Sequence, residues 1–144
     1  MPTNRLSLYE AAREAARLGG QRSRQLLHGA QTRNKSESYN LVTDADIETE
    51  NYIRGILSAR FPGHTILGEE GRHDIDLFSQ SLWIIDPIDG TNNYVHGYPH
   101  YSTSVAYAEN GEVIVGAVFD PERGELFSAY LGGGAFLNGS RIGV

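Results

Sequence analysis

The sequence contains no cysteine, which excludes disulfide bonds and any site built on a thiolate. A metal bound by this chain must therefore have oxygen or imidazole ligands. An excess of positive charge is also missing, because the formal net charge is −6 at pH 7. Nucleic-acid backbones attract basic surfaces, so this charge argues against a nucleic-acid partner. An acidic chain that handled phosphate esters would need bound cations.

Long apolar runs are absent as well. No run approaches the roughly 18 residues of a membrane span, and the N-terminus lacks the apolar core of a signal peptide. We therefore expect a cytoplasmic protein without a membrane partner. With 144 residues, 40% hydrophobic and 21% charged, the composition is that of a globular protein. No internal repeat or linker interrupts it, so residues 1–144 are expected to form one domain.

Hydrophobic periodicity predicts two helices in the first part of the chain. The first is expected over residues 7–28, with a disturbance at Gly19 and Gly20. The second is expected over residues 43–61, where Thr43 and Asp46 resemble a capping box. A polar loop and a short extended segment at 41–43 would separate the two helices.

The second part of the chain has the pattern of strands. Short strands are expected at "TILGEE" and "SLWIID", with a short helix at "TNNYVHGY". From Ser102 onward, alternating residues predict an antiparallel meander, in which Asn110 and Gly111 form a type I′ turn. Two helices followed by such strands indicate the α+β class, with helices on one face of a largely antiparallel sheet.

Two acidic clusters follow apolar strands, Glu69-Glu70 in "LGEEG" and the pair Asp86 and Asp89 in "WIIDPIDGTNN". Burying a carboxylate at a strand end is costly unless it is paired or binds a metal. A tight turn stiffened by Pro87 would place both aspartates and the Ile88 carbonyl on one side. Carboxylates with a carbonyl and waters are ligands that Mg²⁺ prefers. The alternative is a solvated loop in which Asp89 or Thr91 caps a helix.

The residues after the aspartates favour an anion site. "DGT" opens a helix, where free backbone N–H groups attract negative charge. Gly90 permits a close backbone approach, and Thr91 adds a hydroxyl. Metals beside a phosphate cradle indicate phosphoryl transfer to water.

Four segments, in this order, resemble the inositol monophosphatase family of Mg²⁺-dependent phosphatases. They are "LVTDAD", "LGEEG", "WIIDPIDGTNNYVHGYP" and "GAVFDPERGELFSAYLGGGAFLNG". The resemblance runs from about Lys35 to Asn138 and implies a layered α/β sandwich of the sugar-phosphatase type. It also implies two or three Mg²⁺ ions, with Mn²⁺ as a substitute, inhibition by lithium, and a homodimer in the complete protein.

The resemblance further implies roles for individual residues. Glu69 and Asp86, with the carbonyl of Ile88, match the ligands of the first metal. Asp86 and Asp89 match ligands of the second, and Asp89 also matches a substrate-binding residue. The implied reaction is hydrolysis of inositol monophosphate, or of a similar sugar or polyol phosphate monoester, by direct attack of a metal-activated water.

Catalytic and phosphate-binding roles are implied in the same way. Thr91 matches the residue that, with Glu69, activates the attacking water, and Asp46 matches the carboxylate that holds this threonine. Gly90 and Thr91 match the phosphate cradle, and Lys35 matches a lysine of a mobile loop.

The family continues for about as many residues again, with a W-D-x-A motif, whereas Trp83 is the only tryptophan here. We therefore expect a truncated N-terminal portion whose second layer is missing. Two alternatives stay open. One is the fructose-1,6-bisphosphatase or 3′-phosphonucleotidase branch of the same fold. The other is a non-catalytic truncated relative that acts by binding a partner.

Overall fold

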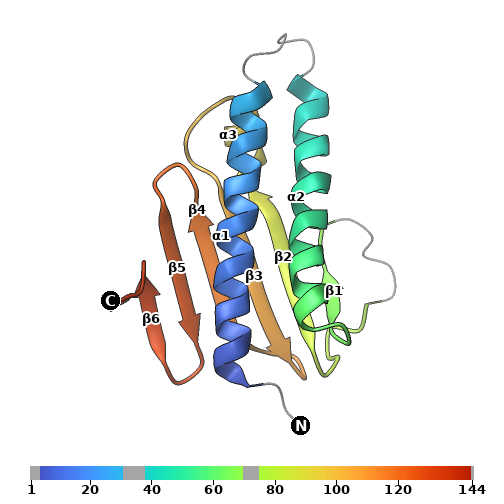
Figure 1. Cartoon of the computed structure of the whole chain (residues 1–144), viewed down its shortest axis with the longest axis vertical. Helices are drawn as coiled ribbons and strands as arrows, with labels where there is room; N and C mark the ends of the chain where they lie inside the picture. Colours follow the sequence, from blue (N-terminus) through green and yellow to red (C-terminus); the bar gives the residue numbers. More distant parts are fainter. Residues whose placement is uncertain (1–3, 31–37, 70–74, 144) are drawn as a thin grey trace.

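The computed structural model describes residues 4–30, 38–69 and 75–143, and contains helices and strands in the order that the sequence predicts (Figure 1). The helices are α1 (Arg5–Ala30), α2 (Ser38–Arg60) and α3 (Thr91–Val95). The strands are β1 (Thr65–Leu67), β2 (Leu82–Asp89), β3 (Ser102–Glu109), β4 (Glu112–Asp120), β5 (Glu125–Tyr130), β6 (Gly134–Leu137) and β7 (Ser140–Ile142). No helix in these ranges is both long and apolar enough to cross a membrane.

The seven strands form one mixed sheet whose spatial order follows the chain, from β1 to β7. Only β1 and β2 run parallel, and every later pair is antiparallel. The turn between β3 and β4 has positive φ at Asn110 (51°) and Gly111 (86°), as a type I′ turn requires. The predicted α+β class and hairpin are confirmed.

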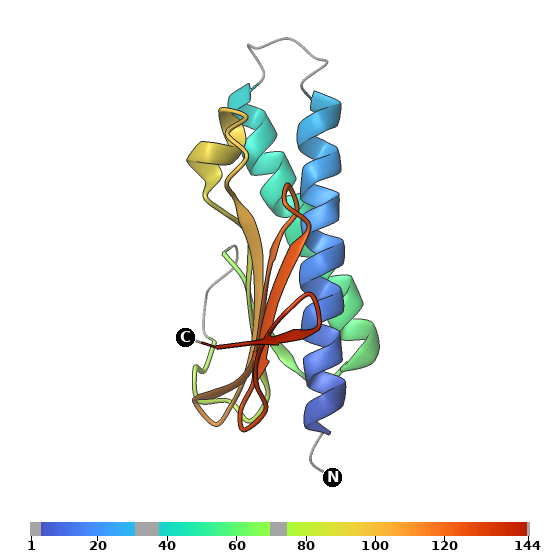
Figure 2. The same ribbon diagram turned by 90° about the vertical axis from the view of Figure 1, so that its left-hand side faces the viewer.

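Helices α1 and α2 lie side by side on one face of the sheet (Figures 1 and 2). The main core lies between them and the strands, where Leu8, Ile53, Trp83, Val105 and Tyr107 are fully buried. Alternate residues of each strand point to opposite faces. The helices therefore cover only one of the two sets of strand side chains.

The glycine pair of α1 does not disturb the helix, contrary to the expectation from sequence. Instead, it lets α1 approach its neighbours closely. A Cβ atom on Gly19 would lie 2.7 Å from the Ile53 side chain of α2, and one on Gly20 would lie 2.6 Å from the ring of Phe119 in β4. The conformational cost of glycine in a helix is thus offset by close packing.

The start of α2 was also predicted wrongly. The helix begins at Ser38, so Thr43 lies inside it and residues 41–43 are helical rather than extended. The spacing of Thr43 and Asp46 fits a capping box, but three residues is equally the spacing of neighbours on one helix face. The expected loop lies partly outside the described residues, at 31–37, while Gly29 and Ala30 still belong to α1.

The open face of the sheet is lined by small and apolar residues. One row of paired residues crosses five strands as Ala106, Gly116, Ala129, Ala135 and Ile142. A parallel row contains Val118, Phe127 and Leu137. Val118 and Phe127 are 39% and 41% exposed. Apolar residues therefore lie on both faces of the sheet, but the helices cover only one of these faces.

We predict that the 144-residue chain associates or aggregates in solution, because a contiguous exposed apolar surface favours contact with another chain. Sedimentation velocity should show species larger than a monomer. Replacing the two most central exposed side chains, Val118→Ser with Phe127→Ser, should shift the distribution toward the monomer. Replacing Leu77, which is exposed outside the sheet, should not. A monodisperse wild-type monomer would contradict the prediction.

Candidate metal centre

The candidate site lies where β1 and β2 end at the same edge of the sheet. The two strands are parallel, with Thr65 paired to Leu82 and Leu67 paired to Ile84. Glu69 follows the end of β1 by two residues, and Asp86 follows Ile84 by two residues in β2. The two carboxyl groups share a hydrogen bond. Parallel pairing thus brings together two acidic clusters that are 17 positions apart in the sequence.

An irregularity in β2 places both aspartates on one face. Asp86 pairs with Ser104 and Asp89 with Ser102, so three steps along β2 oppose two along β3. In a regular strand, residues three apart point to opposite faces, and one extra residue restores the same face. The prediction of a tight turn after residue 86 was therefore wrong in form, because β2 continues through the bulge to Asp89.

Buried contacts hold this bulge. Ile88 is 1% exposed and packs with Tyr94 and Tyr101 in a second small core. The Thr103 hydroxyl donates a hydrogen bond to the Pro87 carbonyl at 2.8 Å. Because the Ile88 side chain is buried in this core, Asp86 and Asp89 of the same motif face the opposite, open side of the sheet.

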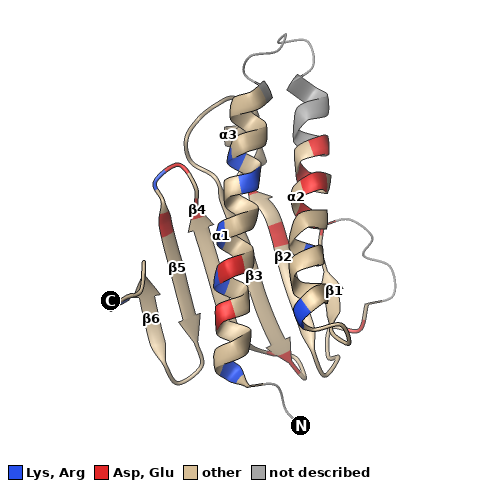
Figure 3. Ribbon diagram, viewed as in Figure 1, with Lys and Arg blue, Asp and Glu red and all other residues tan. Residues whose placement is uncertain are grey.

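Helix α2 adds acidic groups from the other side. Asp46 and Glu50 are four residues apart and therefore lie on the same helix face. Figure 3 shows acidic residues along α2 and on β2. The Glu50 carboxylate accepts the backbone N–H of Glu69 at 2.9 Å. Glu50 is a residue that the sequence analysis missed, although its spacing from Asp46 on a helix was a usable signal.

Burial, with the charges of neighbouring acids, raises the pKa values of two of these groups. Glu69 is a largely exposed residue, yet partial burial of its carboxyl and the nearby charges of Asp86 and Asp46 raise its pKa to about 7. Burial raises the pKa of Asp86, and Asp89 adds to this effect. Hydrogen bonds from Glu69 and from the Ile88 backbone act in the opposite direction. Both shifts mean that burial and neighbouring carboxylates disfavour the charged forms of these two groups.

The donor set fits a hard cation. Among the described residues, the Oδ1 atom of Asp86 is buried without a hydrogen-bond partner, and it lies beside a second carboxylate. Oxygen donors of this kind are the ligands of Mg²⁺ and Mn²⁺. The same part of the chain contains no group of three or more His, Asp or Glu residues already arranged as a cage. Glu69 and Asp86 are in direct contact, and Asp89 approaches only as a neighbouring charge.

The residues after Asp89 form a glycine turn and the five-residue helix α3. Gly90 precedes the helix with φ at 90°, and no side chain caps it. The alternative of a cap by Asp89 or Thr91 is therefore not observed. A Cβ atom at Gly90 would lie 3.1 Å from the His100 carbonyl oxygen. Both the left-handed conformation and this close approach require glycine.

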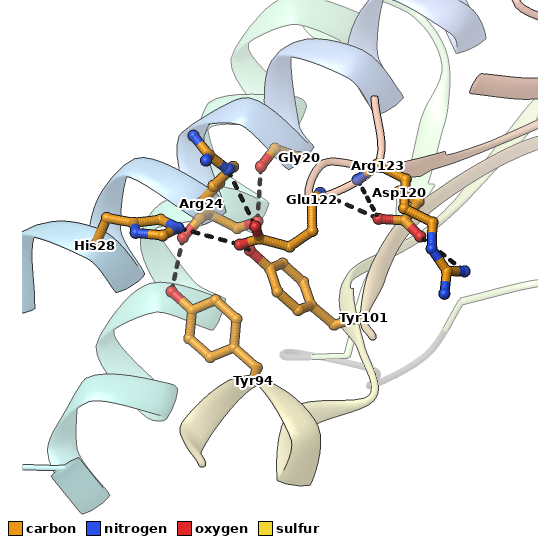
Figure 4. A network of polar contacts seen from close by, with 9 residues as sticks. Gly20, Arg24, His28, Tyr94, Tyr101, Asp120, Glu122 and Arg123 are labelled. Atoms are coloured by element: carbon orange, nitrogen blue, oxygen red, sulfur yellow. Dashed lines mark hydrogen bonds and ion pairs between the residues drawn. The ribbon is translucent and has the colours of Figure 1, made fainter. Parts of the chain in front are cut away.

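A polar network ties this segment to α1 (Figure 4). The Tyr94 hydroxyl donates to the Ser23 carbonyl at 2.8 Å. Glu122, in the turn between β4 and β5, accepts from the Tyr101 hydroxyl at 2.8 Å and contacts His28 and Arg24. These contacts lower the pKa of Glu122. The residues on both sides of the 90–101 segment are thus fixed to the long helix.

A cleft of about 400 Å³ adjoins the site and opens over the uncovered face of the sheet. Its wall on the site side contains Asp89, Gly90 and Asn93, and the far wall contains Val118 and Arg123. Two residues singled out by sequence, Lys35 and Glu70, lie outside the described residues. The remaining candidates come from α2, from β2, from α3 and from the residues just after β1 and β2; they are Asp46, Glu69, Asp86, Ile88, Asp89, Gly90 and Thr91.

Comparison with known proteins agrees with this architecture. A sequence model of the inositol monophosphatase family matches residues 4–144. The inositol-1-monophosphatase of Bacillus subtilis is 40% identical over 142 residues, which cover 97% of this chain and 54% of that protein. A fructose-1,6-bisphosphatase/inositol-1-monophosphatase of Thermotoga maritima is 47% identical over 106 residues, or 72% of this chain and 40% of that protein.

Comparison with solved structures leads to the same family. The crystal structure of inositol monophosphatase II from Staphylococcus aureus superposes with a TM-score of 0.86 at 33% identity, covering 95% of this chain and 50% of that one. The chain therefore belongs to the inositol monophosphatase family. It spans about half the length of the relatives that it matches.

The raised pKa of Glu69 predicts a pH dependence of the metal-free chain. The folded state holds this proton up to about pH 7, whereas an unfolded Glu releases it near the ordinary pKa of 4.5. Since the folded state binds more protons between these values, the free energy of unfolding should fall as pH rises from about 4.5 to 7.

Thermal unfolding in chelator at pH 5 and pH 8 checks this expectation. The change with pH should be smaller in Glu69→Gln, which cannot titrate, than in the wild type. Glu14→Gln, at a distant ion pair with Arg60, is the matched control. An unchanged pH slope in Glu69→Gln would count against the shift.

Proposed function

We propose that this chain supplies most of the catalytic centre of a Mg²⁺-dependent phosphatase acting on inositol monophosphate or a similar polyol phosphate monoester. The proposal depends on one observation above all, the contact of Glu69 with Asp86 at the ends of two parallel strands, with Asp89 on the same face. Two partly buried carboxylates in contact, both with raised pKa values, make a site that favours a cation.

The ligands of the proposed ions are Glu69, Asp86, the Ile88 carbonyl and Asp89. Bound Mg²⁺ would supply positive charge for the leaving oxygen and lower the pKa of a water molecule. The role of the chain itself is to hold the carboxylates at the sheet edge through the parallel register and the bulge. Asp86, between the other two, is the residue suited to bridge two ions.

Thr91 and Asp46 are proposed to orient the attacking water together with Glu69. Thr91 is the first residue of α3, and α3 packs against α2, which carries Asp46. The Asp46 charge raises the pKa of both Glu69 and Tyr94 of α3, so its field extends to both sides of the site. The backbone of Gly90 and Thr91 is proposed as the phosphate cradle.

The cleft beside Asp89 is a candidate position for the polyol, since a carboxylate accepts hydrogen bonds from hydroxyl groups. A second substrate class has its own support, because the Thermotoga relative bears the names of both a fructose-1,6-bisphosphatase and an inositol-1-monophosphatase. We further propose that the natural protein is cytoplasmic, acts on small-molecule esters and forms a homodimer.

The first test of this function replaces Asp86 by Asn in the natural protein. The substitution removes the bridging charge, so Mg²⁺-dependent release of phosphate from inositol 1-phosphate should fall to background. Asp44→Asn, an exposed change in α2, is the control and should retain activity. Fructose 1,6-bisphosphate assayed in parallel distinguishes the two substrate classes. Turnover retained in Asp86→Asn would refute the mechanism.

A second test concerns the hydroxyl group of Thr91. Thr91→Ala should lower kcat by about 100-fold, at the lower end of what a proton-transferring or orienting group contributes. Thr91→Ser keeps the hydroxyl and should retain most of the activity. The Mg²⁺ concentration for half-maximal rate should change little in either variant. Equal activity in Thr91→Ala and the wild type would remove Thr91 from the mechanism.

A further inference from the structure

We propose that Glu50 is the positioning residue of the metal centre: it holds the backbone of Glu69, and the affinity for the cation depends on this hydrogen bond. This inference rests on the proposed function, because it assumes that Glu69 is a metal ligand. It adds a residue of α2 that belongs to none of the motifs discussed above.

Glu50 is buried, with only 4% of the residue exposed. A buried carboxylate is costly unless partners satisfy it. One of its oxygens accepts the Glu69 N–H at 2.9 Å, and the other contacts Arg54 Nε at 3.2 Å. Arg54 also donates to the Ile66 carbonyl of β1 at 3.4 Å. The ion pair between Glu50 and Arg54 therefore attaches α2 to the chain at two points, before and after Gly68.

Gly68 shows how closely this carboxylate approaches the chain. A Cβ atom built on Gly68 would lie 2.2 Å from Oε1 of Glu50, a distance that real atoms do not adopt. Position 68 therefore accepts only glycine while Glu50 occupies its place. The backbone φ at this position is not in the left-handed region, so the requirement for glycine comes from Glu50 and not from backbone strain.

The arrangement has a functional consequence. Glu69 follows the end of a strand of only three residues, β1, and its side chain is largely exposed. The contact with Asp86 joins two groups of like charge and cannot by itself keep Glu69 in place once both are ionised. The hydrogen bond that the Glu69 N–H donates to Glu50 holds the backbone and does not involve the ionisable group of Glu69. Outer partners of this kind commonly change metal affinity about 10- to 100-fold.

Two substitutions that both remove the negative charge of Glu50 separate the effect of this hydrogen bond from the effect of the charge. Glu50→Gln keeps an oxygen that can accept the Glu69 N–H, whereas Glu50→Ala has none. In the natural protein at pH 8, the Mg²⁺ concentration that produces half of the maximal rise in melting temperature is measured for each variant. We expect this midpoint to rise about 10- to 100-fold in Glu50→Ala and by less than about threefold in Glu50→Gln.

The matched control is Glu48→Gln, which removes the same charge from the same helix at an ion pair with Arg22. Its midpoint should stay within about threefold of the wild type. A purely structural role for Glu50 would lower the melting temperature without Mg²⁺ and leave the midpoint unchanged. If Glu50→Ala does not fold, Glu50→Ala with Arg54→Met removes both charges and should show the same rise in midpoint.

Gly68→Ala gives an independent test through a double-mutant cycle. The added methyl group should displace Glu50 and raise the Mg²⁺ midpoint in the wild-type background. In the Glu50→Ala background it should have little further effect, because no carboxylate is left to displace. Additive effects of the two substitutions would overturn the proposal.

Other outcomes are equally decisive. Suppose that Glu69→Gln abolishes the rise in melting temperature with Mg²⁺. If Glu50→Ala then leaves the Mg²⁺ midpoint unchanged, or raises it no more than Glu50→Gln does, the role of Glu50 is refuted and the proposed function is not. A wild-type protein that shows no response to Mg²⁺ or Mn²⁺ would overturn the proposed function and, with it, the role of Glu50.

Discussion

Repulsion between carboxylates at the ends of β1 and β2 is the constraint on which the rest of the site depends. Glu69 and Asp86 share a hydrogen bond while burial and neighbouring acids raise their pKa values. Because the pKa of Glu69 is raised to about 7, the pair does not readily carry two negative charges near neutral pH. The fold nevertheless holds them together, by parallel strand register on one side and by α2 on the other. The cation proposed above would relieve this repulsion by supplying positive charge between the carboxylates.

The packing of α1 serves this arrangement at a distance. Its two glycines allow close contact with α2 and β4, and a Cβ atom on either would also approach Thr103 to 3.4 Å. Thr103 in turn holds the Pro87 carbonyl at the bulge of β2. Near its C-terminal end, α1 receives the hydroxyl of Tyr94 and contacts Glu122. The long helix therefore braces both the bulge and the helix that follows it.

The open side of the sheet bears on the extent of the site. The cleft beside Asp89 continues onto the uncovered face, where Val118 and Phe127 line it. The matched relatives are about twice as long as this chain. The residues described here account for the carboxylates, the glycine turn and a cleft that opens over the uncovered face.

Local pattern was sufficient for much of the fold. Helical periodicity, the strand alternation after Ser102 and the Asn110–Gly111 turn depend on neighbours in sequence, so they could be predicted with the α+β class. The order of the motifs was likewise enough to indicate the family. The start of α2 was predicted wrongly, because the three-residue spacing of Thr43 and Asp46 occurs both in a capping box and inside a helix.

Tertiary structure alone decided how the site is assembled. The sequence shows Asp86 and Asp89 three apart, a spacing that a regular strand would split between two faces, and only the pairing with Ser104 and Ser102 reveals the extra residue. The sequence likewise could not show that Glu50 contacts the backbone of Glu69, because the two residues are 19 positions apart and α2 ends between them. Local chemistry determines which element forms, whereas contacts between distant segments determine which side chains meet.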